Sequence, residues 1–307
     1  MKKTALALAV VTLSICFGLP VQRADTSSTV PSPDDRGPVT ADINDSDEFF
    51  NAAVKSAGPE RDHSQKIEAL LKRMTLEEKV GQMTQLTMGM IVTGRDQDIQ
   101  VDPEKLQKAV VKYGVGSILN VSDQALTPDK WQDTIRQIQE AATKKTRLGI
   151  PVMYGIDSIH GATYVLGSTL FPQEIGMAAT WNPELMKRGS EIAAMETRAV
   201  GIPWSFSPVL DIGRQPLWPR FWETFGEDPY LTKVMGVAFV RGLEGSDVSS
   251  QDHVASSLKH YMGYSLPLTG RDRTPAWIPE NYMREYVLPP FAAAIKARCA
   301  HGDGQLR

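Results

Sequence analysis

The chain has 307 residues, of which 42% are hydrophobic and 22% charged, and its formal net charge is −3. This composition is typical of a globular protein with a sizeable core, in one large domain or two ordinary ones. Because acidic and basic residues are mixed along the chain, it lacks the basic stripe of a nucleic-acid-binding protein and the polybasic patch of a membrane-surface protein. We therefore expect neither nucleic acid nor, after removal of the export signal described next, a membrane as partner.

The N-terminus has the pattern of an export signal. Two lysines precede an apolar run over residues 5–19. This run has the length of a secretory signal and is short for a transmembrane helix. Residues 1–24 are therefore predicted to be a signal peptide, which implies a periplasmic or secreted protein. A membrane anchor is the alternative reading of the same run.

The next stretch, residues 25–60, is predicted to be a flexible leader because much of it is rich in Ser, Thr, Pro and Asp. The predicted folded body, residues 61–297, contains no cysteine, since the two cysteines are Cys16 and Cys299. An exported body without disulfides must be stabilised by its core, which is typical of a large domain.

Helical periodicity begins at about Gln65. An apolar helix face is formed by Ile67, Leu70, Leu71 and Met74. The sequence T-L-E-E at 75–78 then predicts a capping box at the start of a second helix, in which Glu78 reaches back to Thr75.

Short apolar runs alternate with helical stretches over the rest of the body. The runs, which we predict to be strands, cover residues 82–88, 115–121, 150–157, 203–211 and 254–261. Asn182-Pro183 and Asp228-Pro229 predict helix starts, because each places a capping side chain before a proline at the first helical position. A last helix is expected from about Glu280, with one apolar face made of Met283, Val287, Phe291 and Ile295.

Strands that alternate with helices predict an α/β fold with a parallel sheet. Five strands fit either a doubly wound sheet or a (β/α)8 TIM-barrel-like domain. No G-x-G-x-x-G follows the first strand, so a dinucleotide-binding fold loses its main support. A barrel is favoured, although the pattern alone does not decide between the two.

Charged residues follow three of the predicted strands. Asp157, Asp211 with Arg214, and Lys259 with His260 stand at these strand ends, where a barrel carries its functional residues. Taken singly, each is more often a turn former, a cap or an ion-pair partner. Together on one barrel face they would form a dense hydrogen-bonding cup, suited to a ligand with many hydroxyls but also to a phosphate or carboxylate.

Metal binding and a serine-hydrolase triad have little support in the sequence. His160 and His260 lie on different elements without H-x-x-x-H spacing or a cysteine pair. No G-x-S-x-G motif is present either. We expect no metal and no cofactor.

Several longer motifs together resemble one enzyme family. They are RMTLEEKVGQMTQ (73–85), PVMYGIDSIHG (151–161), TLFPQEIGMAATWNPEL (169–185), FSPVLDIGRQPLWPRFWETFGEDPYL (206–231) and SLKHYMGYS (257–265). In this order and spacing, over residues 60–298, they resemble the N-terminal domain of glycoside hydrolase family 3, in its exo-acting β-glucosidase branch.

The resemblance implies a (β/α)8 barrel followed by an α/β sandwich domain, so that this chain would be truncated, with about five of the eight barrel strands. It implies hydrolysis of terminal β-D-glucosidic bonds with release of glucose and retention, on a small carbohydrate substrate such as a β-glucoside or oligosaccharide. Carried over by motif, Asp157 would grip sugar hydroxyls, with Arg214, Lys259 and His260 in the same subsite. The segment 270–273 would add Asp272 or Arg271.

One motif departs from the family pattern. Where the family has D-P-R-W-G-R, this chain reads Q-P-L-W-P-R at 215–220. Trp218, Arg220 and Glu223 remain, so we expect the frame of the loop to be kept with a change at its tip.

The β-N-acetylhexosaminidase branch has histidine-containing P-G-H-G and D-S-H motifs after its K-H. This chain continues instead with YMGYSLPLTG at 261–270. The glucosidase branch is therefore favoured over that alternative.

The carboxylates that would carry out the chemistry are not found in this sequence. Retaining hydrolysis needs two carboxyl groups about 5 Å apart. The family's nucleophile is an Asp in an S-D-W-like motif, and its acid/base is a Glu of the second domain; Asp303 lacks the S-D-W context. We therefore expect this chain to be inactive in itself, with a non-catalytic sugar-binding remnant as the alternative.

The last ten residues, 298–307, carry no periodic pattern. Residues 298–306 match a frame-shifted reading of the family's sixth strand, so we interpret them as an out-of-frame tail. The fifth strand would have an unpaired edge, so the barrel could not close. We therefore expect the folded chain to be only marginally stable.

Overall fold

The computed structural model describes residues 63–297. The predicted signal peptide (1–24), leader (25–60) and out-of-frame tail (298–307) lie outside the described residues and stay predictions. All described residues fall within one unit of the chain.

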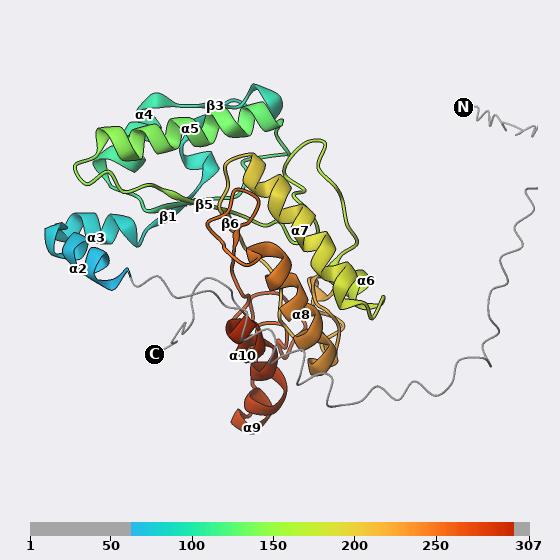
Figure 1. Cartoon of the computed structure of the whole chain (residues 1–307). Coiled ribbons are helices and arrows are strands. Elements are labelled where there is room, and N and C mark those ends of the chain that lie inside the picture. The colour runs from blue at the N-terminus through green and yellow to red at the C-terminus, as the bar shows by residue number, and fades with distance from the viewer. Residues whose placement is uncertain (1–62, 298–307) are drawn as a thin grey trace, which may run out of the picture. The chain divides into compact units, whose positions relative to one another are not determined.

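A five-stranded parallel sheet forms the centre of the described part (Figure 1). Its order is β1-β4-β5-β6-β7, and each adjacent pair is parallel. The strands are β1 (Gln85–Thr87), β4 (Ser117–Leu119), β5 (Met153–Ile156), β6 (Trp204–Ser205) and β7 (Ala255–Ser256). The five predicted strands and their parallel pairing are thus confirmed. The paired stretches are shorter than the apolar runs, partly because Pro203 and Pro208 flank β6 and offer no N–H for a ladder.

Helices follow the strands in the alternation expected of an α/β fold. They are α2 (Ser64–Arg73), α3 (Leu76–Gln82), α4 (Pro103–Leu106) continued by η4 (Gln107–Lys112), α5 (Pro128–Lys145), α6 (Glu174–Ala178), α7 (Pro183–Ala199) and α8 (Pro229–Glu244). Helices α7 and α8 lie side by side, and α10 (Leu288–Ala297) packs on α8 (Figure 1).

The predicted helix starts are confirmed by their caps. Thr75 Oγ1 accepts from the Glu78 N–H at 3.2 Å, and Glu78 Oε2 accepts from the Thr75 N–H at 2.9 Å. The side chain of Asn182 accepts from Leu185 N–H at 3.0 Å, and that of Asp228 accepts from Leu231 N–H at 2.8 Å. These bonds satisfy N–H groups that have no partner within the first turn of a helix.

Two features go beyond the sequence prediction. A short antiparallel pair, β2 (Val92–Thr93) with β3 (Gln100–Val101), follows β1. The last predicted helix begins at Glu280 but consists of α9 (Glu280–Tyr282), a π-helical segment η6 (Met283–Val287) and α10. Val287 and Phe291 of its predicted apolar face are buried.

The core has two main clusters. One lies between α5 and the first strands and includes Trp131, Ile118 and Tyr154, all fully buried. The other joins α8 to α10 through side chains such as Phe239 and Phe291. Within the described residues, no helix is long and apolar enough to cross a membrane.

Gly155 of β5 allows a close approach between β5 and the segment after β6. A Cβ at this position would stand 2.3 Å from Cζ of Phe206, so any larger residue would displace that ring. Glycine is therefore required where β5 leads into Asp157.

Candidate functional site

The carboxyl ends of the parallel strands bring together polar side chains from four segments. Asn120 follows β4, Asp157 follows β5, Asp211 follows β6, and Lys259 with His260 follows β7. An isolated bridge pairs Val209 with Lys259, which brings the last two segments into register. Parallel strands end at one edge of a sheet, so these side chains meet there.

Asp157 is held by a cation and an amide. Lys259 Nζ lies 2.5 Å from Asp157 Oδ1, and Asn120 Nδ2 donates to Asp157 Oδ2 at 2.7 Å. The Asp157 N–H donates in turn to Asn120 Oδ1 at 3.1 Å. These bonds fix the direction of the carboxylate. Because Asp157 is only partly buried, the carboxylate can still accept further hydrogen bonds.

Asn120 adopts a left-handed backbone conformation, with φ +54°. Asn enters this region more readily than most residues because its short side chain can hydrogen-bond locally. The Tyr154 hydroxyl donates to the Asn120 carbonyl at 2.5 Å, and burial raises the pKa of that hydroxyl. Asn120 was not predicted from the sequence, although it is the last polar residue of the predicted strand 115–121 and directly follows the observed β4, as Asp157 follows β5.

His260 lies between a buried carboxylate and a guanidinium. Asp211, which is fully buried, has Oδ2 2.9 Å from the His260 N–H and 2.7 Å from its Nδ1. Nε2 lies 3.1 Å from Nη2 of Arg220. Since a guanidinium can only donate, Nε2 accepts and Nδ1–H donates to Asp211. The two partners thus select one neutral tautomer of His260. The Lys259–His260 peptide bond is cis.

Arg220 also forms a bidentate pair with Glu223, with Nε–Oε1 and Nη2–Oε2 distances of 2.7 Å. The Glu223 side chain is 7% exposed. The Glu223 carboxylate raises the pKa of Arg220 further above its ordinary value. Its guanidinium also lies over the rings of Trp218 and Tyr264. The sequence motif predicts Arg220 only as part of the loop frame, and its contact with His260 was not predicted.

Asp272 is joined to the same group through aromatic side chains. Its Oδ1 accepts from the Tyr264 hydroxyl at 2.6 Å and from Trp218 Nε1 at 2.9 Å. The Tyr264 bond is the main reason why the pKa of Asp272 lies below its ordinary value. Of the two residues suggested for segment 270–273, Asp272 thus contacts the cluster, whereas Arg271 is exposed.

Arg214, expected in the same cup, lies apart from it. Its Nη1 donates to the Tyr282 hydroxyl at 2.9 Å and its Nε to the Glu227 carbonyl at 3.2 Å. The guanidinium lies 4.7 Å from the centre of the Tyr286 ring. A tight turn, in which the Arg214 N–H donates to Ile212 O, directs the chain away from the strand end. The structure therefore places Arg220, and not Arg214, beside His260.

A hollow of about 240 Å³ opens at this strand edge. It is lined by Asp157, Ile159, His160, Thr163, Tyr164, Gln173, Arg220, Trp222 and Glu223. One ring nitrogen of His160 is bound to the backbone: Nδ1 lies 2.9 Å from Phe171 O, so Nδ1–H donates to this carbonyl. The wall of the hollow combines polar side chains with apolar ones.

Glu174 is a third buried carboxyl group close to these residues, after Asp211 and Glu223. It is 0% exposed, and its Oε1 accepts from the Val209 N–H at 3.1 Å. Its Oε2 is buried without a hydrogen-bond partner. Burial raises its pKa well above the ordinary value of 4.5, despite the nearby charge of Lys259, while Glu223 and Asp211 add to the rise. The group therefore favours the neutral acid.

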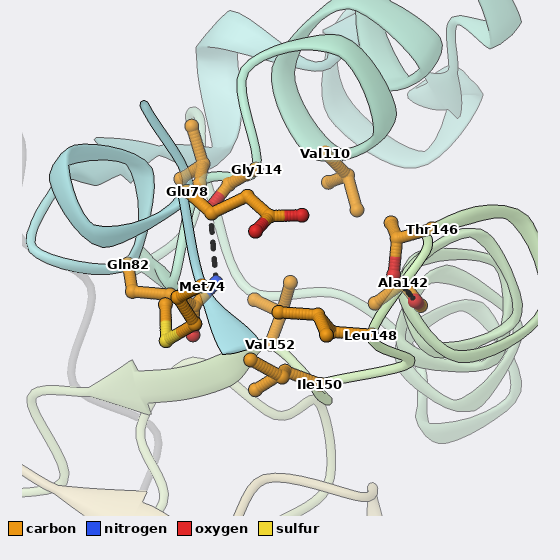
Figure 2. A pocket seen from close by; sticks show the side chains of 11 residues that line it. Met74, Glu78, Gln82, Val110, Gly114, Ala142, Thr146, Leu148, Ile150 and Val152 are labelled. Atoms are coloured by element: carbon orange, nitrogen blue, oxygen red, sulfur yellow. Dashed lines mark hydrogen bonds between the residues drawn. The ribbon is translucent and has the colours of Figure 1, made fainter. Parts of the chain in front are cut away.

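A smaller cavity of about 40 Å³ lies at the opposite end of the strands (Figure 2). Its lining includes Gln82, which precedes β1, Val115, which precedes β4, and Val152, which precedes β5. Gln82 Nε2 donates to the Gly114 carbonyl at 2.9 Å, the dashed bond in Figure 2. Glu78 in its wall is paired with Arg147. This cavity is largely apolar and lies away from the strand edge that carries Asp157.

Among residues 63–297 no three His, Cys, Asp or Glu side chains form a group that could hold a metal ion. The strand-edge cluster is built of ion pairs and hydrogen bonds between protein groups. It offers a carboxylate as hydrogen-bond acceptor and cationic groups as donors.

Residues 75–301 match the family described as glycosyl hydrolase family 3 N terminal domain. A lysosomal beta glucosidase of Dictyostelium discoideum is 42% identical over 242 residues, which are 75% of this chain and 29% of the relative. A periplasmic beta-glucosidase of Salmonella typhimurium is 30% identical, over 74% of this chain and 27% of its own length.

Solved structures agree with these matches. A beta-glucosidase involved in saponin metabolism from intestinal bacteria superposes with a TM-score of 0.60 at 37% identity, covering 79% of this chain and 29% of that one. Beta-glucosidase from Listeria innocua in complex with glucose gives a TM-score of 0.65 at 30% identity, covering 76% and 32%. The chain thus spans about 30% of the length of the relatives it matches.

Proposed function

Because the chain belongs to glycosyl hydrolase family 3 through its N-terminal domain, we propose that its strand-edge cluster is the sugar-binding part of a β-glucosidase. The reaction is hydrolysis of a terminal β-D-glucosidic bond, with release of glucose and retention of configuration. The observation that carries this proposal is a hollow at the carboxyl edge of the sheet that is lined by Asp157 and Arg220. Behind this wall, Lys259 contacts Asp157 and His260 contacts Arg220.

The proposal divides the groups into those that contact the sugar and those that position them. Asp157 accepts hydrogen bonds from neighbouring sugar hydroxyls, while Lys259 and Asn120 fix the direction of its carboxylate. Arg220 donates to the ligand and to His260, and takes the place expected for Arg214. Asp272 has an indirect role: it does not contact the sugar but holds Tyr264 and Trp218 beside the Arg220 guanidinium.

The carboxylates that line the hollow are poorly suited to the covalent chemistry. Retaining hydrolysis needs a free nucleophile and a proton donor about 5 Å apart. Asp157 is bound to Lys259, and Glu223 is bound bidentately to Arg220. We therefore propose that neither serves as nucleophile, and that the 307-residue chain binds the sugar without cleaving a glycoside.

Calorimetric titration of the 307-residue protein with glucose tests the binding proposal. Wild-type protein is expected to bind, and D157N to bind at least tenfold more weakly, because an amide cannot replace the carboxylate as a double acceptor. D129N, at an exposed Asp on α5, is the matched control and should bind as the wild type does. Absence of binding to the wild-type chain, or equal binding by D157N, would contradict the proposal.

Activity is tested separately with 4-nitrophenyl β-D-glucopyranoside. We expect no release of nitrophenol above that of a heat-denatured sample. Turnover that D157N abolishes would overturn the proposed inactivity and show that the chain carries a complete site. Binding without turnover would agree with the non-catalytic reading.

The β-N-acetylhexosaminidase alternative is addressed by the same titration with N-acetylglucosamine. The glucosidase branch predicts weaker binding of this sugar than of glucose, and the reverse order would favour the alternative. We further propose that the protein is exported, which is in line with the periplasmic name of the Salmonella relative.

A further inference from the structure

Trp222 is one of two large aromatic side chains on the wall of the hollow, the other being Tyr164. It lies in the short helix η5 (Phe221–Glu223), is 47% exposed, and lines the hollow together with Asp157 and Arg220. A half-exposed indole has apolar surface in contact with water, so covering it with an apolar ligand surface is favourable.

The indole is held in place before any ligand arrives. Its Nε1–H donates to the Pro219 carbonyl at 2.8 Å. Arg220, two positions before it, and Glu223, directly after it, are joined by the bidentate pair, and the Glu223 N–H donates to Arg220 O at 3.0 Å. With its N–H engaged, the indole offers its carbon surface to a ligand, and little rotamer freedom remains to be lost on binding.

We propose that Trp222 is a stacking platform for the pyranose ring, a contact that rests on the proposed sugar-binding function. In a β-glucopyranoside the hydroxyls are equatorial, so they point outward around the ring and leave axial C–H groups on its faces. Asp157 and Arg220 take hydroxyls at the ring edge, while Trp222 covers the C–H face. Trp222 thereby selects a cyclic pyranoside over an open-chain polyol that carries similar hydroxyls.

Other exposed tryptophans provide a comparison. Within residues 63–297, Trp181 is 73% exposed and Trp277 is 81% exposed, and neither lines the hollow. Exposure alone therefore does not single out Trp222; its position on the wall with Asp157 and Arg220 does. Trp277 is the matched control position.

The test is an NMR titration of methyl β-D-glucopyranoside, with sorbitol as the open-chain comparison, against the 307-residue protein. W222A is expected to bind the glucoside roughly threefold to tenfold more weakly than wild type, and W222F to lie within about twofold of it. The ring protons of the bound glucoside should shift upfield in wild type and lose this shift in W222A. W277A should leave both readouts unchanged, and sorbitol should bind W222A and wild type equally.

The outcomes separate this proposal from the one on which it rests. If wild type binds the glucoside, D157N does not, and W222A matches wild type, the platform is refuted and the sugar site stands. If W222F loses as much affinity as W222A, an aromatic ring is not what matters, and the platform is again refuted. If wild type binds no glucoside at all, the proposed function itself fails.

Discussion

Asn120 and Asp157 are joined by two reciprocal hydrogen bonds, which connect the carboxyl ends of β4 and β5. The amide of Asn120 donates to the carboxylate at 2.7 Å, and its carbonyl accepts the Asp157 N–H at 3.1 Å. The amide thus serves as donor and acceptor at once, which a carboxylate at position 120 could not do.

We therefore expect N120D to lower the free energy of unfolding at pH 7 by about 2 kcal/mol, because it removes a donor and sets two carboxylates side by side. The loss should be smaller at about pH 5, because two adjacent carboxyl groups take up a shared proton more readily than a single one does, and the protonated group can donate. Denaturant titrations at both pH values measure this. N281D, at an exposed Asn of α9, should show no such loss, and an equal effect in both variants would contradict the expectation.

The Arg220–Glu223 pair gives a second prediction. R220A leaves a carboxylate whose side chain is 7% exposed without its cation, so we expect a loss of about 3 kcal/mol of unfolding free energy. The double variant R220A/E223A should be more stable than R220A, because no buried charge is left unpaired. A double variant that is less stable than R220A would show that the two residues act independently.

Glu174 predicts a dependence of stability on pH. Burial raises its folded-state pKa above the ordinary value of 4.5. At a pH between the unfolded-state pKa and the folded-state pKa, the unfolded chain has released a proton that the folded chain retains. Stability therefore falls as pH rises through this interval, by up to about 1.4 kcal/mol per pH unit.

E174Q keeps an acceptor for the Val209 N–H and cannot ionise. It should be more stable than wild type at pH 7, and the difference should decrease towards zero near pH 4.5 and below. Thermal or denaturant unfolding across this range measures it. A difference that stays constant with pH would mean that Glu174 does not titrate differently in the folded protein.

The surface of α3 gives a fourth prediction. Leu76, Val80 and Met83 are 73%, 51% and 82% exposed, and Leu76 and Val80 line an open groove of about 1270 Å³. Exposed apolar surface of this kind promotes self-association. We expect L76E/M83E to reduce association in light-scattering measurements, while unfolding free energy changes by less than about 0.5 kcal/mol. Q65E on α2 adds charge without removing apolar surface and should leave association unchanged.

Much of the fold could be predicted because its signals are local. The five apolar runs, the capping box at Thr75 and the Asn-Pro and Asp-Pro helix starts each depend on a few neighbouring residues, and all are present in the structure. The β2–β3 pair was missed because each of its strands has two residues, too few to show an alternating pattern.

The candidate site was predictable only in part, since strand ends locate residues but do not orient loops. Asp157 directly follows β5, and Lys259 and His260 come shortly after β7, so the parallel sheet brings them to the same edge. Arg214 and Arg220 lie in one long loop after β6, and which of them turns back is decided by tertiary partners: Glu223 and His260 for Arg220, Tyr282 for Arg214. Those partners are as much as 68 positions away in the chain.

The two-residue strand β7 stands at one end of the sheet order and leads to both Lys259 and His260. Short edge elements are among the first to open in native-state fluctuations. Opening of β7 would withdraw Lys259 from Asp157 and His260 from Asp211 at the same time. Changes that weaken the protection of the β7 amides from hydrogen exchange should therefore also weaken sugar binding. A bound sugar would then slow exchange most strongly at the Ala255 and Ser256 amides, beyond its direct contacts.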